Sequence, residues 1–182
     1  MYPNCKGCET ADNGAKSVRL PGGWSVNHYG GPEGFFGWLA LQTVKHRGTL
    51  SDLRPTEAAT LGPNLRKLET GIYKYWKGHG RPVDRVYVMY FLEGQLEAGH
   101  EWHFHVHVVP RFQELKRLMG KPHMPEEIDA YQIAKLSHIL PSFLDRVAFK
   151  KRYGEPKRAR VEGRILDGVV RAAGFPRGPK GK

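Results

Sequence analysis

The sequence Trp102-His103-Phe104-His105-Val106-His107-Val108-Val109-Pro110-Arg111 alternates three histidines with apolar residues. In a β-strand successive side chains point to opposite faces, so the histidines share one face and Phe104, Val106 and Val108 share the other. In a helix the same histidines would spread around the axis. The pattern therefore predicts a strand with one face in a hydrophobic core and a histidine face lining a pocket. A His-rich surface strand and an incidental metal patch are the alternatives, and the strong β-formers on the second face disfavour both.

Further strands are predicted on both sides of a long helix. Ser17–Leu20 and Trp24–Tyr29 are expected to be short strands separated by the Pro21-Gly22-Gly23 turn. The apolar run Phe36–Val44 is typical of a central strand, and Arg85–Leu92 alternates in the manner of another. Together with residues 102–111 these segments predict an α+β fold, an antiparallel β-meander sheet with one long helix.

The long helix is expected to begin at Pro55 and to end at Gly78-His79-Gly80. Its apolar side chains recur at three- and four-residue steps, which predicts one buried face formed by Ala58, Leu61, Leu65, Leu68, Ile72 and Tyr75. Gly62-Pro63 lies inside this pattern, and proline lacks the N–H that a helix interior needs. We therefore expect a kink or a break there.

The character of the chain changes after Arg111. A helix is expected from Pro125, and Lys150–Arg160 is predicted to be a solvated basic linker. A short amphipathic helix ended by Gly174 should follow, marked by Val161, Ile165, Val169 and Ala173. Pro176–Lys182 is expected to be disordered. The predicted organisation is a catalytic domain over residues 1–115 and a helical, basic C-terminal extension over residues 116–182.

Positive charge is concentrated near the C-terminus. The chain carries a net charge of +11, and residues 150–182 hold eleven Lys/Arg against three Asp/Glu, which is +8 of that total. Such a field attracts polyphosphates and nucleic acid alike. Nucleic-acid binding through residues 150–182 is therefore kept beside the simpler interpretation of a solvated basic face. The segment itself lacks the aromatic-plus-basic platform of a single-strand binder.

No stretch approaches the roughly 20 apolar residues of a membrane helix, and the N-terminus has no basic-then-apolar leader. We therefore expect a cytoplasmic protein without a membrane partner. In that compartment Cys5-Lys6-Gly7-Cys8 is compatible with zinc, with a redox pair, or with a remnant in a loose tail. A closed zinc site needs two more ligands, and His46 and His103 are candidates.

The pattern His-x-His-x-His, followed by two apolar residues and Pro-Arg, resembles the active-site strand of the histidine triad superfamily of nucleotide hydrolases and transferases. The likeness continues upstream through Glu97-Ala98-Gly99-His100, which is similar to the family's phosphate-contacting loop, and back to Trp24–Leu53. The resemblance implies that His105 attacks the α-phosphate of a nucleotide and forms a covalent nucleotidyl-histidine. A nucleoside monophosphate is then released to water or another acceptor.

The resemblance also assigns the surrounding roles. His107 would contact the phosphate or the leaving-group oxygen, His103 would set the framework, and His100 would donate to a phosphate oxygen or act as an acid. The nucleotide-binding set is Asn27, Gly99, His100 and His107. Asn27 would hold the ribose hydroxyls; His28 is the alternative ligand at that position, and an Asn that only caps the turn is an alternative role for Asn27.

In the zinc-bearing branch of the family, Cys5, Cys8, His46 and His103 would hold one structural Zn²⁺. Relatives commonly form homodimers through the long helix and a neighbouring strand. Dinucleoside polyphosphates, nucleoside phosphoramidates, adenylyl sulfate and nucleotide sugars all present a substituted α-phosphate. The galactose-1-phosphate uridylyltransferase branch fits less well, because its strand carries Pro between two His and Gln in place of His107. The alternative functions are a catalytically silent nucleotide-binding protein and a nucleic-acid-binding protein acting through the basic C-terminus.

Overall fold

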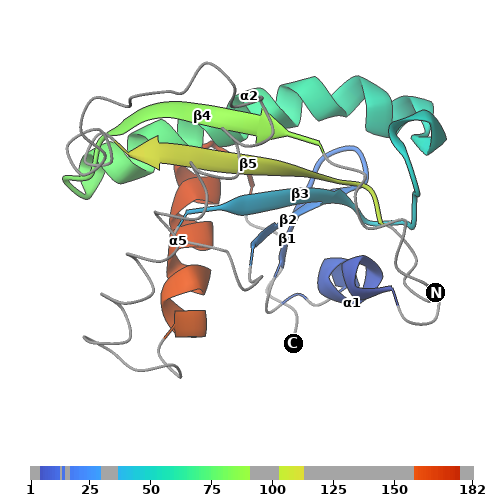
Figure 1. Cartoon of the computed structure of the whole chain (residues 1–182), viewed down its shortest axis with the longest axis horizontal. Coiled ribbons are helices and arrows are strands. Elements are labelled where there is room, and N and C mark those ends of the chain that lie inside the picture. The colour runs from blue at the N-terminus through green and yellow to red at the C-terminus, as the bar shows by residue number, and fades with distance from the viewer. Residues whose placement is uncertain are drawn as a thin grey trace, which may run out of the picture.

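The structure, a computed structural model, describes residues 5–12, 14, 17–29, 37–90, 103–112 and 158–176. These residues form a five-stranded antiparallel sheet with the strand order β1-β2-β3-β5-β4, shown in Figure 1. The strands are β1 Ser17–Leu20, β2 Trp24–His28, β3 Leu39–Thr43, β4 Val83–Met89 and β5 His105–Phe112. The helices are α1 Lys6–Asp12, the 3-10 turn η1 Leu50–Asp52, α2 Pro55–Gly78 and α5 Arg158–Ala172. The predicted α+β antiparallel fold with its long helix is confirmed.

Strand register sorts the side chains into two faces. Across the sheet His107 lies opposite Ala40, which lies opposite Asn27. One row away His105 lies opposite Gln42, and Gln42 lies opposite Ser25. Directly paired residues point to the same side of a sheet, so both rows belong to the histidine face. The alternation expected for residues 103–107 therefore extends over three strands.

The opposite face of the sheet is the hydrophobic core, which α2 and α5 cover. Its fully buried side chains include Trp24, Val26, Leu39, Leu41, Phe104 and Val108. From α2, Leu68 and Ile72 are also fully buried. The indole Nε1 of Trp24 donates to the carbonyl of Glu57 at 3.0 Å, which joins β2 to the first turn of α2. The core thus holds the sheet rigidly and leaves the histidine face for the site.

The helix α2 runs through Pro63 without a break, so the expected interruption at Gly62-Pro63 is wrong. Gly62, Pro63 and Ala59 are all exposed. The carbonyl of Ala59, which loses its donor to proline, therefore faces water, and water satisfies it. Of the predicted apolar stripe, Leu68 and Ile72 are buried, whereas Ala58 is exposed. A polar residue, Asn64, shares the buried face because its Nδ2 donates to the carbonyl of Pro21 at 2.9 Å.

The expected amphipathic helix near the C-terminus is α5, and Gly174 follows its end with a positive φ of 73°. It begins at Arg158, so residues 158–160 of the expected linker are helical instead. Its apolar side chains join the same core, packed on α2 and β2: Ile165, Leu166, Val169 and Val170. A Cβ at Gly71 would lie 2.5 Å from the carbonyl oxygen of Val169, so only glycine allows this close crossing of α2 and α5.

The packing of α5 places residues 158–175 in one core with the sheet. The division at residues 115 and 116 stays a prediction. The helix expected from Pro125, the linker before residue 158 and the tail after residue 176 lie outside the described residues. None of the helices that the structure describes is long and apolar enough to cross a membrane.

Candidate active site and metal centre

The three histidines lie on β5 and the residues just before it, between β3 and β4. His103 and His107 are buried, and His105 between them is half-buried. A strand inside the sheet is held by its neighbours on both sides, so its side chains are fixed in position. The central histidine is the one that is most open to a ligand.

The hydrogen bonds of the histidines determine where their protons lie. The indole Nε1–H of Trp38 donates to Nδ1 of His107 at 2.9 Å, so neutral His107 carries its proton on Nε2. Nδ1–H of His105 donates to the carbonyl of His103 at 2.9 Å. The two Nε2 atoms of His105 and His107 are 3.1 Å apart, and only the bond from His107 to His105 satisfies both tautomers. In this chain of bonds the unprotonated atom of His105 is Nε2.

Burial lowers the pKa of His105, and its bond to the carbonyl of His103 only partly opposes that effect. Removal from water disfavours the charged form of an imidazole. His105 is therefore neutral near pH 7, with its lone pair on Nε2, the atom that accepts the bond from His107. A neutral imidazole with this lone pair is a nucleophile, whereas an imidazolium is not.

A second cluster lies at the base of β5. Cys5, Cys8, His46 and His103 offer ligand atoms that all lie within 4.8 Å of one another. Nδ1 of His103 is 3.4 Å from each cysteine Sγ, and Nδ1 of His46 is 3.6 Å from Sγ of Cys8. Zinc bonds of about 2.3 Å to sulfur and 2.0 Å to nitrogen at tetrahedral angles separate these atoms by about 3.5 Å. The cluster therefore fits a closed tetrahedral zinc site.

The surroundings of the cluster orient its ligands. Nε2–H of His103 donates to the carbonyl of Thr43 at 2.7 Å, which leaves Nδ1 unprotonated toward the two thiols. The backbone N–H of Cys8 donates to Sγ of Cys5 at 3.4 Å, which fixes the position of this sulfur. A Cβ on Gly7 would lie 2.5 Å from both Cβ and Cγ of His103. Only glycine between the cysteines lets α1 approach the ring this closely.

A partly buried ion pair holds the loop that carries His46. The guanidinium of Arg47 donates to both carboxylate oxygens of Glu57, at 2.8 and 3.0 Å. The same carboxylate accepts the backbone N–H of Arg54 at the start of α2. The carbonyl of Arg47 accepts the N–H of Phe104 at 2.7 Å. Glu57 thereby joins α2, the His46 loop and the beginning of β5.

Of the two predicted ribose ligands, Asn27 lies on the histidine face and His28 on the opposite one. His28 accepts the N–H of Gly37 at 2.9 Å, and its Nδ1 lies 3.8 Å from a carboxylate oxygen of Glu162 on α5. Asn27 donates from Nδ2 to the carbonyl of His28 at 3.1 Å. Gly99 and His100, the predicted phosphate-loop residues, lie outside the described residues.

Three residues near the site were not predicted from the sequence: Trp38, Tyr29 and Gln42. Trp38 bonds to His107, and Tyr29 stacks on Trp38 with ring centroids 4.6 Å apart. Gln42 lies directly opposite His105. The signal was available for two of them. Applying the two-residue period to Phe36–Val44 would have placed Trp38, Ala40 and Gln42 on one face.

No family model matches the chain, and no curated protein matches it. Among solved structures, it is similar to a uridylyltransferase at 12% identity and a TM-score of 0.51, covering 93% of this chain but 46% of the other. It is similar to SMU.412c from Streptococcus mutans UA159 at 18% identity and 0.50, covering 79% and 87% of the two chains. A HIT family protein from Bacillus anthracis str. 'Ames Ancestor' follows at 16% and 0.49, covering 75% and 94%.

The chain thus has an α+β fold with a histidine-bearing interior strand, and histidine triad proteins are among the solved structures to which it is similar. At these identities the similarity concerns the fold. The uridylyltransferase is about twice the length of this chain, so its similarity concerns half of that protein. The chemistry of this protein is argued from its own site.

Proposed function

We propose that this protein is a nucleotide hydrolase or nucleotidyltransferase of the histidine triad type. It cleaves a substituted nucleotide α-phosphate, as in a dinucleoside polyphosphate or a phosphoramidate, through a covalent nucleotidyl-histidine. The observation that carries the proposal is the chain of hydrogen bonds from Trp38 through His107 to His105. It places the lone pair of His105 on Nε2, where it accepts the bond from His107, and it becomes the nucleophile when His107 donates to the substrate instead.

In the first step Nε2 of His105 forms a bond to the α-phosphorus, and the bond from phosphorus to the leaving group breaks. The positive charge on the ring is stabilised by the bond from Nδ1–H to the carbonyl of His103. His107 then donates from Nε2 to an oxygen of the phosphate or of the leaving group. In the second step water attacks phosphorus and gives up a proton to the solvent, the P–N bond breaks with its electron pair returning to Nε2 of His105, and the monophosphate leaves. Asn27 holds the ribose hydroxyls, and Gly99 and His100 contact the phosphate.

The same proposal includes one structural zinc ion held by Cys5, Cys8, His46 and His103. With four protein ligands no position remains for a reactive water, so the ion acts on stability and on the orientation of the His103 ring. The carbonyl of His103 accepts the proton of His105. Zinc binding therefore supports the geometry of the nucleophile indirectly.

The direct test is a screen of diadenosine polyphosphates, adenosine phosphoramidate, adenylyl sulfate and nucleotide sugars, with detection of the released monophosphate. Intact-mass measurement after rapid quenching should show a chain heavier by one nucleotidyl group. Binding of a nucleotide without release of any monophosphate, across the whole panel, would instead indicate the catalytically silent alternative. Neither binding nor release would reject the proposal.

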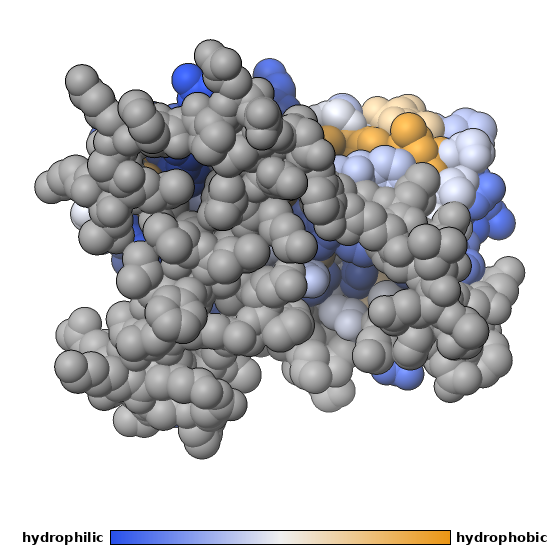
Figure 2. All heavy atoms as spheres, in the orientation of Figure 1, coloured by the Kyte–Doolittle hydropathy of each residue, from blue (hydrophilic) through white to orange (hydrophobic). Residues whose placement is uncertain are grey.

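A homodimer is the proposed assembly, with β4 and α2 at the interface. β4 is the last strand in the order of the described sheet, and its Val88 is 48% exposed. Figure 2 shows an apolar area on the upper right of the molecule, in the region where Figure 1 shows α2. Light scattering after gel filtration should give twice the chain mass, and Val88→Lys should shift it toward the monomer. A monomer mass for the wild type at all concentrations would contradict this.

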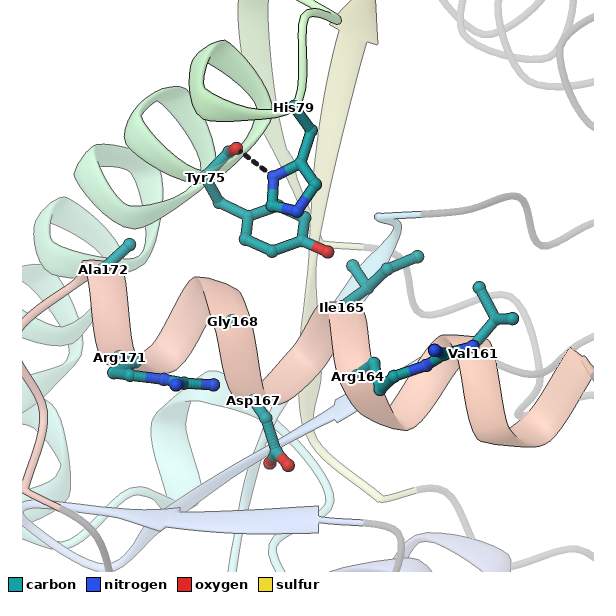
Figure 3. A pocket seen from close by; sticks show the side chains of 9 residues that line it. All are labelled: Tyr75, His79, Val161, Arg164, Ile165, Asp167, Gly168, Arg171 and Ala172. Atoms are coloured by element: carbon teal, nitrogen blue, oxygen red, sulfur yellow. Dashed lines mark hydrogen bonds between the residues drawn. The ribbon is translucent and has the colours of Figure 1, made fainter.

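Nucleic-acid binding is a second candidate, favoured by a hollow of about 720 Å³ between α2 and α5. The rings of Tyr75 and His79 lie 4.2 Å apart at a tilt of 33°, and Arg164 and Arg171 of α5 line the same hollow (Figure 3). Proteins that bind single-stranded nucleic acid combine aromatic rings, on which bases stack, with basic side chains that contact the backbone. Tyr75 and His79 would add aromatic rings to the basic side chains of residues 150–182. Binding of a labelled single-stranded oligonucleotide that weakens in Arg164→Gln/Arg171→Gln, with turnover unchanged, would support this added role. Equal affinity in wild type and variant would exclude the hollow.

A further inference from the structure

Three buried side-chain atoms on the histidine face have no hydrogen-bond partner within the part of the chain that the structure describes: Ser25 Oγ, Asn27 Oδ1 and Gln42 Nε2. All three lie on neighbouring strands, β2 and β3, in the two rows that end at His105 and His107. Buried polar atoms are rarely left without a partner, because no hydrogen bond then offsets the cost of removing them from water. The unpartnered atoms of Gln42 and Asn27 therefore indicate a ligand that binds here, whereas Ser25 is completely buried and is not in contact with that ligand.

Of the three residues, Gln42 lies nearest to the proposed nucleophile, His105. It is directly opposite His105 in the β3–β5 pairing and only 5% exposed. Directly opposed residues have Cβ atoms about 5 Å apart, so the Gln42 amide reaches any group bound at the His105 ring. Its unpartnered atom is an N–H donor, and the acceptor it lacks would be supplied by a phosphate oxygen.

The unpartnered atom of Asn27 is a hydrogen-bond acceptor, whereas that of Gln42 is a donor. Its Nδ2 is used by the carbonyl of His28, so the orphaned atom is the carbonyl oxygen, an acceptor. β2 lies one strand beyond β3, about 5 Å farther from β5. A donor near the nucleophile and an acceptor farther away match a phosphate followed by a hydroxyl-bearing sugar.

We infer that Gln42 is a phosphate-binding residue of this site, donating from Nε2 to a non-bridging oxygen of the nucleotide phosphate bound at His105. The inference rests on the proposed function and adds a residue to it. In the unliganded protein the Gln42 amide is desolvated and unpaired, and the nucleotide supplies its partner. The unpaired Nε2 of Gln42 therefore lowers the stability of the unliganded protein.

This cost makes the inference testable with two readouts that move in opposite directions. Gln42→Met keeps the length of the side chain and removes its polar atoms, whereas Gln42→Glu keeps the shape and replaces the donor by a carboxylate. Ser25→Ala is the matched control, because Ser25 is in the same row with its own orphaned hydroxyl but is fully buried one strand farther away. The probes are AMP, GMP, CMP and UMP, titrated by calorimetry into the full chain, and thermal unfolding without ligand.

We expect Gln42→Met to weaken binding of the preferred monophosphate at least tenfold while its melting temperature equals or exceeds that of the wild type. Gln42→Glu should weaken binding more, because its charge repels phosphate. Ser25→Ala should bind within twofold of the wild type. Binding by Gln42→Met within twofold of the wild type would overturn the inference and leave the proposed function intact. Equal losses of affinity in Gln42→Met and Ser25→Ala, together with lower melting temperatures in both, would overturn it as a structural effect. A wild type that binds no monophosphate and cleaves no substrate would overturn both.

Discussion

Trp38→Phe tests the chain of hydrogen bonds that sets the protonation of the site. The substitution keeps an aromatic ring that can stack on Tyr29 and removes the Nε1–H that donates to His107. Nδ1 of His107 is then a buried acceptor without a donor, which costs about 1–3 kcal/mol. The Nε2–H tautomer thereby loses the donor that favoured it, so the population of the Nδ1–H tautomer rises. In that tautomer His107 has no donor to offer to a phosphate oxygen.

The expected loss follows from that bond. A charge-assisted hydrogen bond to phosphate is worth about 1.5–3 kcal/mol, so kcat/KM should fall about tenfold to a hundredfold. Long-range ¹⁵N–¹H spectra of the imidazoles report the tautomer without any substrate. They should show Nε2–H for His107 in the wild type and an added Nδ1–H population in Trp38→Phe.

Trp76→Phe is the matched control for loss of ring volume. Trp76 is also buried, at 6% exposure, but its Nε1 has no hydrogen-bond partner among the described residues. It should lose stability through packing against Phe112 while kcat/KM and the His107 tautomer stay unchanged. Trp38→Phe with an unchanged His107 tautomer and wild-type kcat/KM would refute the chain of bonds.

Further predictions concern the nucleophile, the metal and the ion pair. His105→Ala should lower turnover by more than a hundredfold with nucleotide binding and fold retained, measured by monophosphate release and calorimetry; a smaller loss would remove His105 from its role. Protein purified without chelator should contain about one zinc per chain by elemental analysis. Removal of the metal with a chelator should lower the melting temperature more than it lowers the rate per folded molecule. Less than about a tenth of a zinc per chain in active protein would exclude the zinc site. Gly7→Ala should weaken zinc binding about tenfold or more in a chelator competition, because its Cβ would lie 2.5 Å from His103. Gly14→Ala is the control and should bind zinc as the wild type does, because nothing lies within 4 Å of a Cβ at that position. Burial raises the pKa of Glu57, but the hydrogen bonds from Arg47 and Arg54 outweigh this effect and hold that pKa below its usual value. The contribution of Glu57 to stability is therefore present above its unfolded-state pKa and is lost as the pH falls through its folded-state pKa. Glu57→Gln should be about 2 kcal/mol less stable than the wild type at pH 7 by chemical denaturation, and its stability should change less over that acid range.

Much of the fold followed from local patterns. The alternation at residues 103–107 determines a strand with a histidine face in any fold that buries Phe104 and Val106, because the period of a strand is two. The limits of α2 followed from Pro55 and from the glycine after its end. Pro63 shows where local rules stop, since a proline costs a helix little when the freed carbonyl faces water.

The sequence alone determined that three histidines share a face and that two cysteines lie three residues apart. The resemblance to the histidine triad superfamily named His46 and His103 as their partners. Only the tertiary structure decided which side chains meet that face, because residues from β2, β3 and β5 become neighbours through pairings that no local pattern specifies. Trp38 sets the tautomer of His107 across 69 positions of sequence, and Gln42 lies opposite His105. The role of α5 was decided in the same way, since the absence of side chains at Gly71 and Gly168 acts only once two helices cross.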